Sequence, residues 1–288
     1  MQRSGSRLYA NLAGVEVGDG FPVRIVGALN VSPESFFSGS VARDVRALQK
    51  NAERMLTEGA DILDLGAMST APYVDGEISE SEEIERMARA VKALRRVGEM
   101  PISIDTQRSQ VASAALAEGA NIINDVSGLY ADPEMAKVAQ SAQGLILMAR
   151  ERGPSAGEPI VTAGSLLRQS LRRARAAQIN MAGIVLDPGI GFYQRGPQPW
   201  YEVDCALLRT LSRLRRLGRP LLIGASRKSF IGRMTGRKAP ADRLFGSIAC
   251  AAIAVFNGAA LVRTHDIAAT LDAVKMAAAI RGDSQCEP

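Results

Sequence analysis

The chain has 288 residues, 47% hydrophobic and 23% charged, a composition that suits a globular protein with a large core and excludes disordered and fibrous classes. No apolar run approaches the ~20 residues of a membrane span, and the N-terminal MQRSGSRLYANLAG lacks the apolar core of a signal peptide. With only three scattered cysteines, this predicts a cytoplasmic protein with reduced thiols and no membrane partner.

One pattern, an apolar run followed by a helical segment, recurs eight times along the chain. The strand-like runs are 23–30, 60–66, 101–106, 120–128, 145–150, 183–192, 221–223 and 259–266. The helical segments that follow them are 41–59, 81–98, 108–119, 132–144, 164–178, 201–218, 240–258 and 267–280. Runs that are apolar throughout, and do not alternate with polar residues, are typical of parallel strands covered on both faces.

Eight such units in about 260 residues predict a single α/β domain, a closed (β/α)8 barrel over residues 23–288. Residues 1–22 are expected to form an N-terminal extension that caps, or forms a hairpin on, the barrel floor. The alternative is an open doubly wound sheet, which would leave edge strands, and these are usually more polar than the runs in this chain.

The net charge of +5 raises the question of a nucleic-acid partner. The arginines lie mainly in amphipathic patterns at 166–178 and 207–219, where they fit the solvated faces of helices. Because no aromatic platform accompanies them, we expect no nucleic-acid binding, although a positive field would favour an anionic small substrate.

The helical segment 244–258, LFGSIACAAIAVFNG, is apolar nearly all round. An outer helix of a barrel normally keeps a polar face, so this segment predicts a homodimer formed through the seventh and eighth helices. Burial under the chain's own termini is the alternative.

Polar residues follow the apolar runs at the strand ends, where a barrel places its active site. They are Asn30, Asp64, Asp105, Thr106, Asn124, Asp125, Arg150, Asp187, Ser226, Arg227, Lys228, Arg263 and His265. Asp105, Asn124, Asp187 and Lys228 suit the amide and amidine edges of a flat heterocycle. Asn30, Arg263 and His265 suit a phosphate-bearing group, and Asn30 could hold a hydrated Mg²⁺.

Each of these residues also has an ordinary structural role open to it. Asp105 and Asn124 could cap the following helices, and Asp187 lies in an Asp-Pro-Gly turn. The Ser-Arg-Lys-Ser stretch after the seventh run could be a solvated turn. Five separate strands would then have to end in a polar residue for unrelated reasons, so a shared site is favoured.

Six blocks of the sequence carry a resemblance to a known family. They are NVSPESF (30–36), SIDT (103–106), INDVSG (123–128), LDPGIGF (186–192), GASRKSFIG (224–232) and RTHD (263–266). In this order they resemble the blocks of dihydropteroate synthase, the pterin-binding barrel enzyme of folate synthesis. The resemblance implies a transferase that joins 6-hydroxymethyl-7,8-dihydropterin diphosphate to 4-aminobenzoate and releases pyrophosphate with Mg²⁺.

The resemblance also implies roles for individual residues. The pterin would be bound by Asp105, Asn124, Asp187, Lys228, Phe192 and Met148. The pyrophosphate would be held by Asn30, Thr70, Arg263 and His265, with Asn30 at the metal, and the acceptor by Ser229, Arg227 and Phe36. Of these, Lys228, Arg263 and Asn30 are expected to contribute most to catalysis.

Two departures from the family's pattern leave the acceptor open. The second loop reads Met-Ser-Thr-Ala-Pro at 68–72, so Ala71 stands where the family usually has arginine. After the fifth apolar run the family often has Met-His-Met, whereas 147–150 read Leu-Met-Ala-Arg, which removes the histidine and adds the cation Arg150. One alternative keeps the pterin donor but uses a methanopterin-type arylamine acceptor. The other is a pterin-binding paralogue or a methyltetrahydrofolate-dependent methyltransferase. We also expect the loops 32–40 and 68–77 to close over bound substrate.

Overall fold

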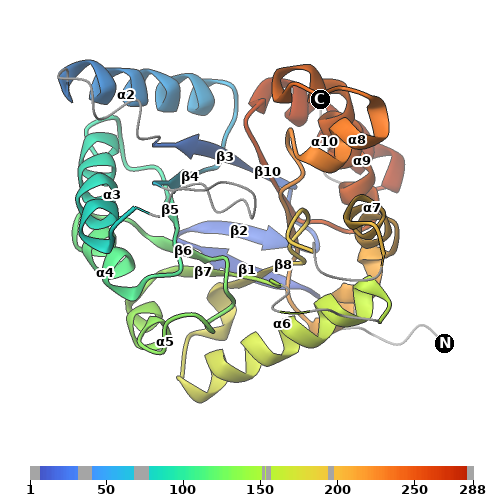
Figure 1. The fold of residues 1–288 in the computed structure, drawn as a ribbon, viewed down its shortest axis with the longest axis horizontal. Coiled ribbons are helices and arrows are strands. Elements are labelled where there is room, and N and C mark those ends of the chain that lie inside the picture. Colours follow the sequence, from blue (N-terminus) through green and yellow to red (C-terminus); the bar gives the residue numbers. More distant parts are fainter. Residues whose placement is uncertain are drawn as a thin grey trace.

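The computed structural model describes residues 7–31, 41–67, 78–150, 153, 157–193 and 198–283, with only the backbone at 41–44. Eight parallel strands form one sheet in the order β8-β7-β6-β5-β4-β3-β10-β9. A parallel bridge between Leu186 and Leu221 joins the two ends of this order, so the sheet curves into a barrel. The predicted (β/α)8 barrel is confirmed (Figure 1).

The barrel strands coincide with the apolar runs of the sequence. They are β3 (Arg24–Asn30), β4 (Ile62–Gly66), β5 (Ile102–Asp105), β6 (Ile122–Asp125), β7 (Gly144–Met148), β8 (Ile184–Asp187), β9 (Leu222–Ile223) and β10 (Leu261–Thr264). Most of their residues are fully buried, because helices cover the outside of the barrel and side chains fill its inside.

The helices that surround the barrel follow the strands in turn. They are α2 (Val41–Thr57), α3 (Glu80–Leu94), α4 (Ser109–Ala117), α5 (Met135–Val138), α6 (Pro159–Ala176), α7 (Trp200–Thr210), α8 (Ser229–Thr235), α9 (Leu244–Phe256) and α10 (Ile267–Arg281). Short 3₁₀ segments lie at Ala139–Ser141, Met181–Gly183, Leu211–Leu217 and Pro240–Arg243. Helix α8 was not predicted, and the helix predicted over 132–144 is α-helical over only four residues.

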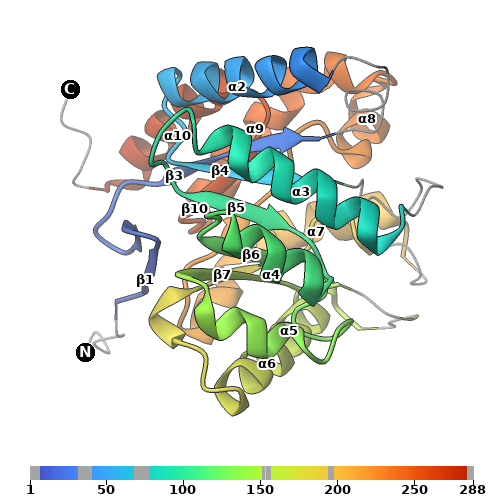
Figure 2. The same ribbon diagram turned by 90° about the vertical axis from the view of Figure 1, so that its left-hand side faces the viewer.

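An antiparallel hairpin, β1 (Tyr9–Leu12) and β2 (Val15–Gly18), lies at the end of the barrel where the strands begin (Figure 2). Its buried side chains Ala10, Leu12 and Val17 pack in one cluster with inward-facing residues of the strands, among them Val26 and Ile146. The hairpin therefore covers the barrel floor. The division at residue 23 into an extension and a barrel domain stays a prediction.

Among the described helices, none is by itself both long enough and apolar enough to cross a membrane. Only Ser229–Thr235 and Pro240–Phe256 taken together reach the required length, and they are bent by 77° at the break between them. The thiols of Cys205 and Cys250 are free.

Candidate functional site

The strand register brings the predicted polar residues to one end of the barrel. Asp105 of β5 is the Cα partner of Asn124 of β6, and Asp187 of β8 is the partner of Met148 of β7. Because parallel strands all finish at the same rim, residues far apart in sequence become neighbours there. In Figure 2 this rim faces away from the N-terminal hairpin.

Asp64 lies at the centre of this rim and is fully buried. One carboxylate oxygen, Oδ2, accepts a hydrogen bond from Arg263 Nε at 2.6 Å. The other, Oδ1, accepts from Ser103 Oγ at 2.6 Å, and Asn124 Nδ2 lies 3.3–3.4 Å from both oxygens. Asp64 thus fixes the guanidinium of Arg263 and the carboxamide of Asn124 in place.

Sequence reasoning counted Asp64 among the strand-end polar residues but gave it no role in the site. The available signal was a charged residue, Asp64, placed between Leu63 and Leu65 in the middle of the apolar run. A buried charge is costly unless it is paired, so its position alone pointed to a cationic partner.

Asp105 has hydrogen-bonding capacity that the described residues do not use. Its Oδ2 lies 3.6 Å from Arg263 Nη2, and its Oδ1 is buried without a hydrogen-bond partner among the described residues. Burial and the nearby Asp64 charge raise the pKa of Asp105 to about 7. An N–H group of a ligand would satisfy this oxygen.

The capping role considered for Asp105 and Asn124 does not occur. Helix α4 has Arg108 at its N-cap and α5 has Glu134, and neither N-cap makes a side-chain capping hydrogen bond. The two residues are therefore left for the rim of the barrel.

Asp187 combines turn chemistry with a place in the site. Its Oδ1 accepts a hydrogen bond from Gly189 N at 2.7 Å, which is the ordinary contact of an Asp-Pro-Gly turn. Its carboxyl is also buried, which raises its pKa, while the charge of Lys228 opposes this rise. The second oxygen remains available to a ligand.

Lys228 rests on the loop that follows β8. Its Nζ donates a hydrogen bond to Ile190 O and lies 4.8 Å from the centre of the Phe192 ring. Burial lowers the pKa of the ammonium, and Asp187 and Asp204 act in the opposite direction. Lys228 also supplies the N-cap of α8, so its backbone is fixed where the helix begins.

Arg150 also contacts Phe192. Its guanidinium carbon lies 5.8 Å from the ring centre, and Nη1 donates to Gln107 Oε1 at 3.4 Å. This half-buried cation therefore connects the loops after β5, β7 and β8 at the rim. Arg150 therefore lies beside a predicted pterin contact, Phe192, and is not a fully exposed surface residue.

Beside Arg263 lies a hydrogen-bonded cluster of two hydroxyls and one imidazole, from Ser226, Thr264 and His265. Ser226 Oγ lies 3.0 Å from His265 Nδ1 and accepts from Thr264 Oγ1 at 3.5 Å and His265 N at 3.3 Å. When the Ser226 hydroxyl donates to Nδ1, the ring carries its hydrogen on Nε2, which is then a donor. Burial, then Arg263 and Arg227, lower the pKa of His265 to about 4, so its ring is neutral at pH 7.

Arg227, predicted to bind the acceptor, is engaged within the protein. Its Nε and Nη2 donate to the two carboxylate oxygens of Asp266 at 2.9 and 2.5 Å. Its backbone has φ of 57°, and its N–H donates to Ser247 Oγ. This geometry favours holding the loop in shape over contact with an acceptor carboxylate, and the acceptor role stays a prediction.

The remaining predicted residues fall into two groups. Asn30 is exposed at the end of β3, Met148 is buried at the end of β7, and Ser229 begins α8. Thr70, Ala71 and Phe36, and the whole of the loops 32–40 and 68–77, lie outside the described residues. The predicted loop closure stays a prediction.

No group of three or more histidine, cysteine or acidic side chains in the described ranges could enclose a metal ion. The residue predicted to hold Mg²⁺, Asn30, has an exposed carboxamide that could offer one oxygen ligand. This fits an ion whose other ligands are phosphate oxygens and water, which is how Mg²⁺ is commonly bound with phosphorylated substrates.

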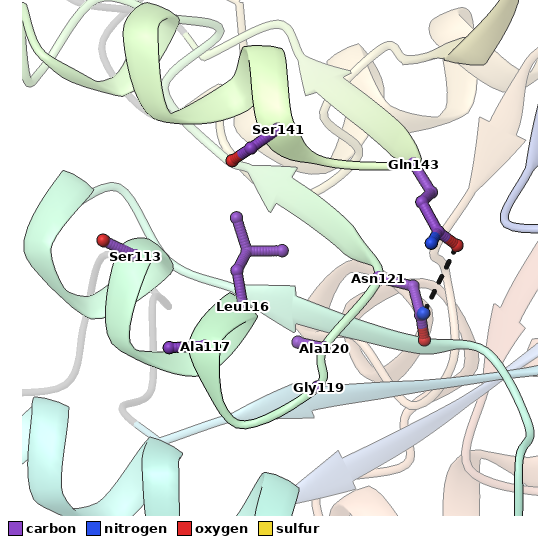
Figure 3. A pocket seen from close by; sticks show the side chains of 8 residues that line it. All are labelled: Ser113, Leu116, Ala117, Gly119, Ala120, Asn121, Ser141 and Gln143. Carbon is purple, nitrogen blue, oxygen red and sulfur yellow. Dashed lines mark hydrogen bonds between the residues drawn. The ribbon is translucent and has the colours of Figure 1, made fainter.

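A separate cavity of about 460 Å³ lies at the opposite end of the barrel (Figure 3). It opens between α4 and the turns that lead into β6 and β7, and Asn121 and Gln143 share a hydrogen bond on one of its walls. None of the predicted site residues lines it.

Comparison with known proteins gives consistent matches over most of the chain. The family model described as pterin binding enzyme matches residues 26–265. The dihydropteroate synthase of Synechocystis sp. is 37% identical over 265 residues, which is 89% of this chain and 89% of that protein.

Solved structures agree with the sequence matches. The structure of Xanthomonas albilineans dihydropteroate synthase with 4-aminobenzoic acid has a TM-score of 0.85 at 32% identity, covering 98% of this chain and 100% of that one. The structure of the same enzyme in complex with 7,8-dihydropteroate has a TM-score of 0.81 at 32% identity, covering 99% and 100%.

Proposed function

This chain belongs to the family of pterin binding enzymes, and we propose its function from that premise. The protein is a transferase of folate biosynthesis that condenses 6-hydroxymethyl-7,8-dihydropterin diphosphate with 4-aminobenzoate, giving 7,8-dihydropteroate and pyrophosphate. The observation that supports this most is the buried rim of Asp105, Asn124 and Asp187 with Lys228 and Arg263.

In our proposal the pterin lies among Asp105, Asn124, Asp187 and Lys228. The buried Oδ1 of Asp105 and the second oxygen of Asp187 accept from ring N–H groups, while Asn124 and Lys228 donate to ring acceptors. Met148 and Phe192 lie beside this region and would provide apolar contacts to the ring faces. A heterocycle held on several edges is oriented, which is a large part of what this reaction needs.

The leaving group is assigned to the other side of the rim. Arg263, whose guanidinium Asp64 fixes, and the Nε2–H of His265 would bind pyrophosphate oxygens, with Thr70 from the second loop. A neutral His265 binds as a hydrogen-bond donor, so the positive charge comes from Arg263. Mg²⁺, held by Asn30, would supply further charge neutralisation for the departing diphosphate.

The chemical step breaks the bond between the exocyclic methylene carbon and the diphosphate oxygen. The electron pair leaves with pyrophosphate, and the pterin ring stabilises the cationic carbon that results. The arylamine nitrogen then attacks this carbon and loses a proton. No residue is assigned as a general base; the protein anchors the ring and neutralises the leaving group.

The acceptor site is proposed at Ser229 and Lys228, with Arg227 holding the loop through Asp266. Phe36 stays a predicted acceptor contact. Arg150 places an extra cation near Phe192. An arylamine with added phosphate is therefore the variant acceptor that this site could also accommodate.

We further propose that two copies assemble through α9 and α10, and that the protein acts in the cytoplasm. On α9, Phe245 is 83% exposed, and Ile253 and Phe256 are also exposed. Met276 and Ile280 extend this apolar surface onto α10, which packs against α9. An exposed apolar surface of this kind is usually covered by a partner.

The function is tested by incubating the purified chain with the pterin diphosphate, Mg²⁺ and a panel of arylamines, and measuring pyrophosphate release. We expect turnover with 4-aminobenzoate, and a loss of about a hundredfold in kcat/KM for Lys228→Met. Lys238→Met is the matched control, because Lys238 is an exposed lysine outside the site.

Other outcomes of this panel would identify the alternatives. Release only with a ribosylated, phosphorylated aminobenzene would indicate a methanopterin-type acceptor. Methyl transfer from methyltetrahydrofolate without pyrophosphate release would contradict the condensation.

A further inference from the structure

A buried carboxylate outside the predicted site contacts the loop after β8, against which the Lys228 ammonium rests. Asp204 lies on α7 and is 1% exposed. Its Oδ1 accepts a hydrogen bond from Gly191 N at 2.7 Å, and its Oδ2 is buried with no hydrogen-bond partner within the described part of the chain. No sequence block pointed to this residue.

The hydrogen bond from Asp204 falls in the middle of the segment on which the Lys228 ammonium rests. The residue before Gly191 supplies the carbonyl that accepts from Lys228 Nζ, and the residue after it is Phe192, whose ring lies against the same nitrogen. Gly191 itself has φ of +87°, and a Cβ there would lie 3.0 Å from Lys228 Cδ. A small shift of this segment would therefore move both of these contacts of the ammonium.

The charge of Asp204 acts on Lys228 as well. Burial raises the pKa of Asp204 to about 6, so the carboxylate is ionised at pH 8. The hydrogen bond from Gly191 N–H and the charge of Lys228 oppose this rise. Among the described residues, the thiols of Cys205 and Cys250 also lie within reach of the Asp204 charge, which raises the pKa of both. In return, Asp187 and Asp204 raise the pKa of Lys228 against the effect of burial.

We propose that Asp204 is a positioning residue, which holds Gly191 N–H from the outer helix and so sets the place of the Lys228 ammonium and the affinity of the site for its pterin. The part of this proposal that concerns the pterin rests on the proposed function. The part that concerns Lys228 stands on the geometry of α7 and the loop after β8.

The test compares Asp204→Ala with Asp204→Asn at pH 8. Asparagine keeps an oxygen for Gly191 N–H, whereas alanine removes it. We expect pterin diphosphate, titrated by calorimetry, to bind about tenfold more weakly to the alanine variant and within about threefold of wild type to the asparagine variant. Equal affinity of the alanine variant and wild type, or an equal loss in both variants, would overturn the proposal.

A second readout needs no substrate. The pKa of Lys228 can be followed by NMR of its side-chain carbons, and we expect it to fall in both variants, since each removes the Asp204 charge. An unchanged Lys228 titration would also overturn the proposal. If the wild-type chain failed to bind pterin, the proposed function would fall, and the Lys228 titration would still decide the role of Asp204.

Asp61→Ala is the matched control for lost stability. Asp61 accepts a backbone hydrogen bond from Ile25 N at 2.7 Å, of the same kind as that of Asp204, but at the end of the barrel where β3 begins. We expect it to lower Tm without changing pterin affinity or the Lys228 titration. A similar loss of affinity in this control would show that the effect of Asp204→Ala is a general effect of destabilisation, and would overturn the proposal.

Discussion

At the scale of single residues, the rim of the barrel is a set of carboxylates and cations that hold one another in place. Arg263 contacts both Asp64 and Asp105, and Lys228 lies near Asp187. Burying these charges is costly, and the mutual pairing offsets the cost. The oxygens that remain unused are the ones that a ligand can reach.

Asp187→Asn tests the pterin anchor. The carboxamide oxygen can still accept from Gly189 N–H, so the turn is kept, but the charge beside Lys228 is lost. We expect pterin affinity to weaken by roughly 2–4 kcal/mol. Calorimetry measures the affinity, and Tm is the control for folding. An affinity equal to that of wild type would show that Asp187 does not bind the pterin.

The raised pKa of Asp105 predicts how pterin binding depends on pH. Its pKa of about 7 means that the free protein loses the carboxylate form as pH falls through 7. If the ionised oxygen accepts from the ligand, affinity falls about tenfold between pH 8 and pH 6, since the ionised fraction falls by that factor. The raised pKa of Asp187 acts in the same direction.

The control for this dependence is Asp105→Asn, which cannot titrate. We expect it to bind more weakly than wild type at pH 8 and to show a much flatter profile. A wild-type affinity that stayed constant from pH 6 to pH 8 would contradict the role given to Asp105.

At the scale of elements, the site depends on the loop that joins β8 to α7. Gly189 has φ of +78°, and a Cβ there would lie 1.9 Å from Ala149 O, because the loops after β7 and β8 touch at this point. Gly218 has nearly the same φ, +77°, with no atom within 4 Å of its Cβ position. Alanine substitutions at these two glycines therefore distinguish the cost of backbone strain, which both positions share, from the cost of a steric clash, which only Gly189 would have.

Gly189→Ala is expected to destabilise the fold by about 3 kcal/mol or more, and Gly218→Ala by about 1 kcal/mol, since only the first adds a clash to the strain of positive φ. Urea unfolding of both variants is the measurement. Equal losses of unfolding free energy would mean that the two loops do not touch as described.

The barrel strands were predictable because they are buried on both faces. Each lies inside the apolar run that predicted it, except that β7 begins one residue earlier. Helix α8 was missed because its sequence, SFIGRMT, is short and follows a cationic cluster that was interpreted as a loop. The helix over 132–144 was predicted too long, since its second half tightens into a 3₁₀ turn at Ala139–Ser141.

The site was predictable where a polar residue ends an apolar run, as at Asp105, Asn124 and Asp187. It was not predictable where the contact joins distant elements. Asp204 lies in an ordinary amphipathic helix, and only the packing of α7 on the loop after β8 brings it to Gly191. Likewise, the pairing of Arg227 with Asp266 depends on the neighbouring positions of β9 and β10.

At the scale of the whole molecule, the exposed apolar residues of α9 and α10 set the expected assembly. Phe245→Glu places a charge in the proposed interface, and we expect sedimentation to show a shift from dimer to monomer at micromolar concentration. Val161→Glu, a partly exposed position on α6 outside the proposed interface, is the control and should remain dimeric. A wild-type chain that sediments as a monomer would contradict the proposed dimer.

The condensation itself is tested most directly by its stoichiometry. In one reaction with the pterin diphosphate, 4-aminobenzoate and Mg²⁺, pyrophosphate and 7,8-dihydropteroate are measured together over time. We predict that they form in equal amounts, and that both stop when either substrate is exhausted. Pyrophosphate release without dihydropteroate, or no release from a chain that binds the pterin, would contradict the assignment of this barrel as a pterin-condensing transferase.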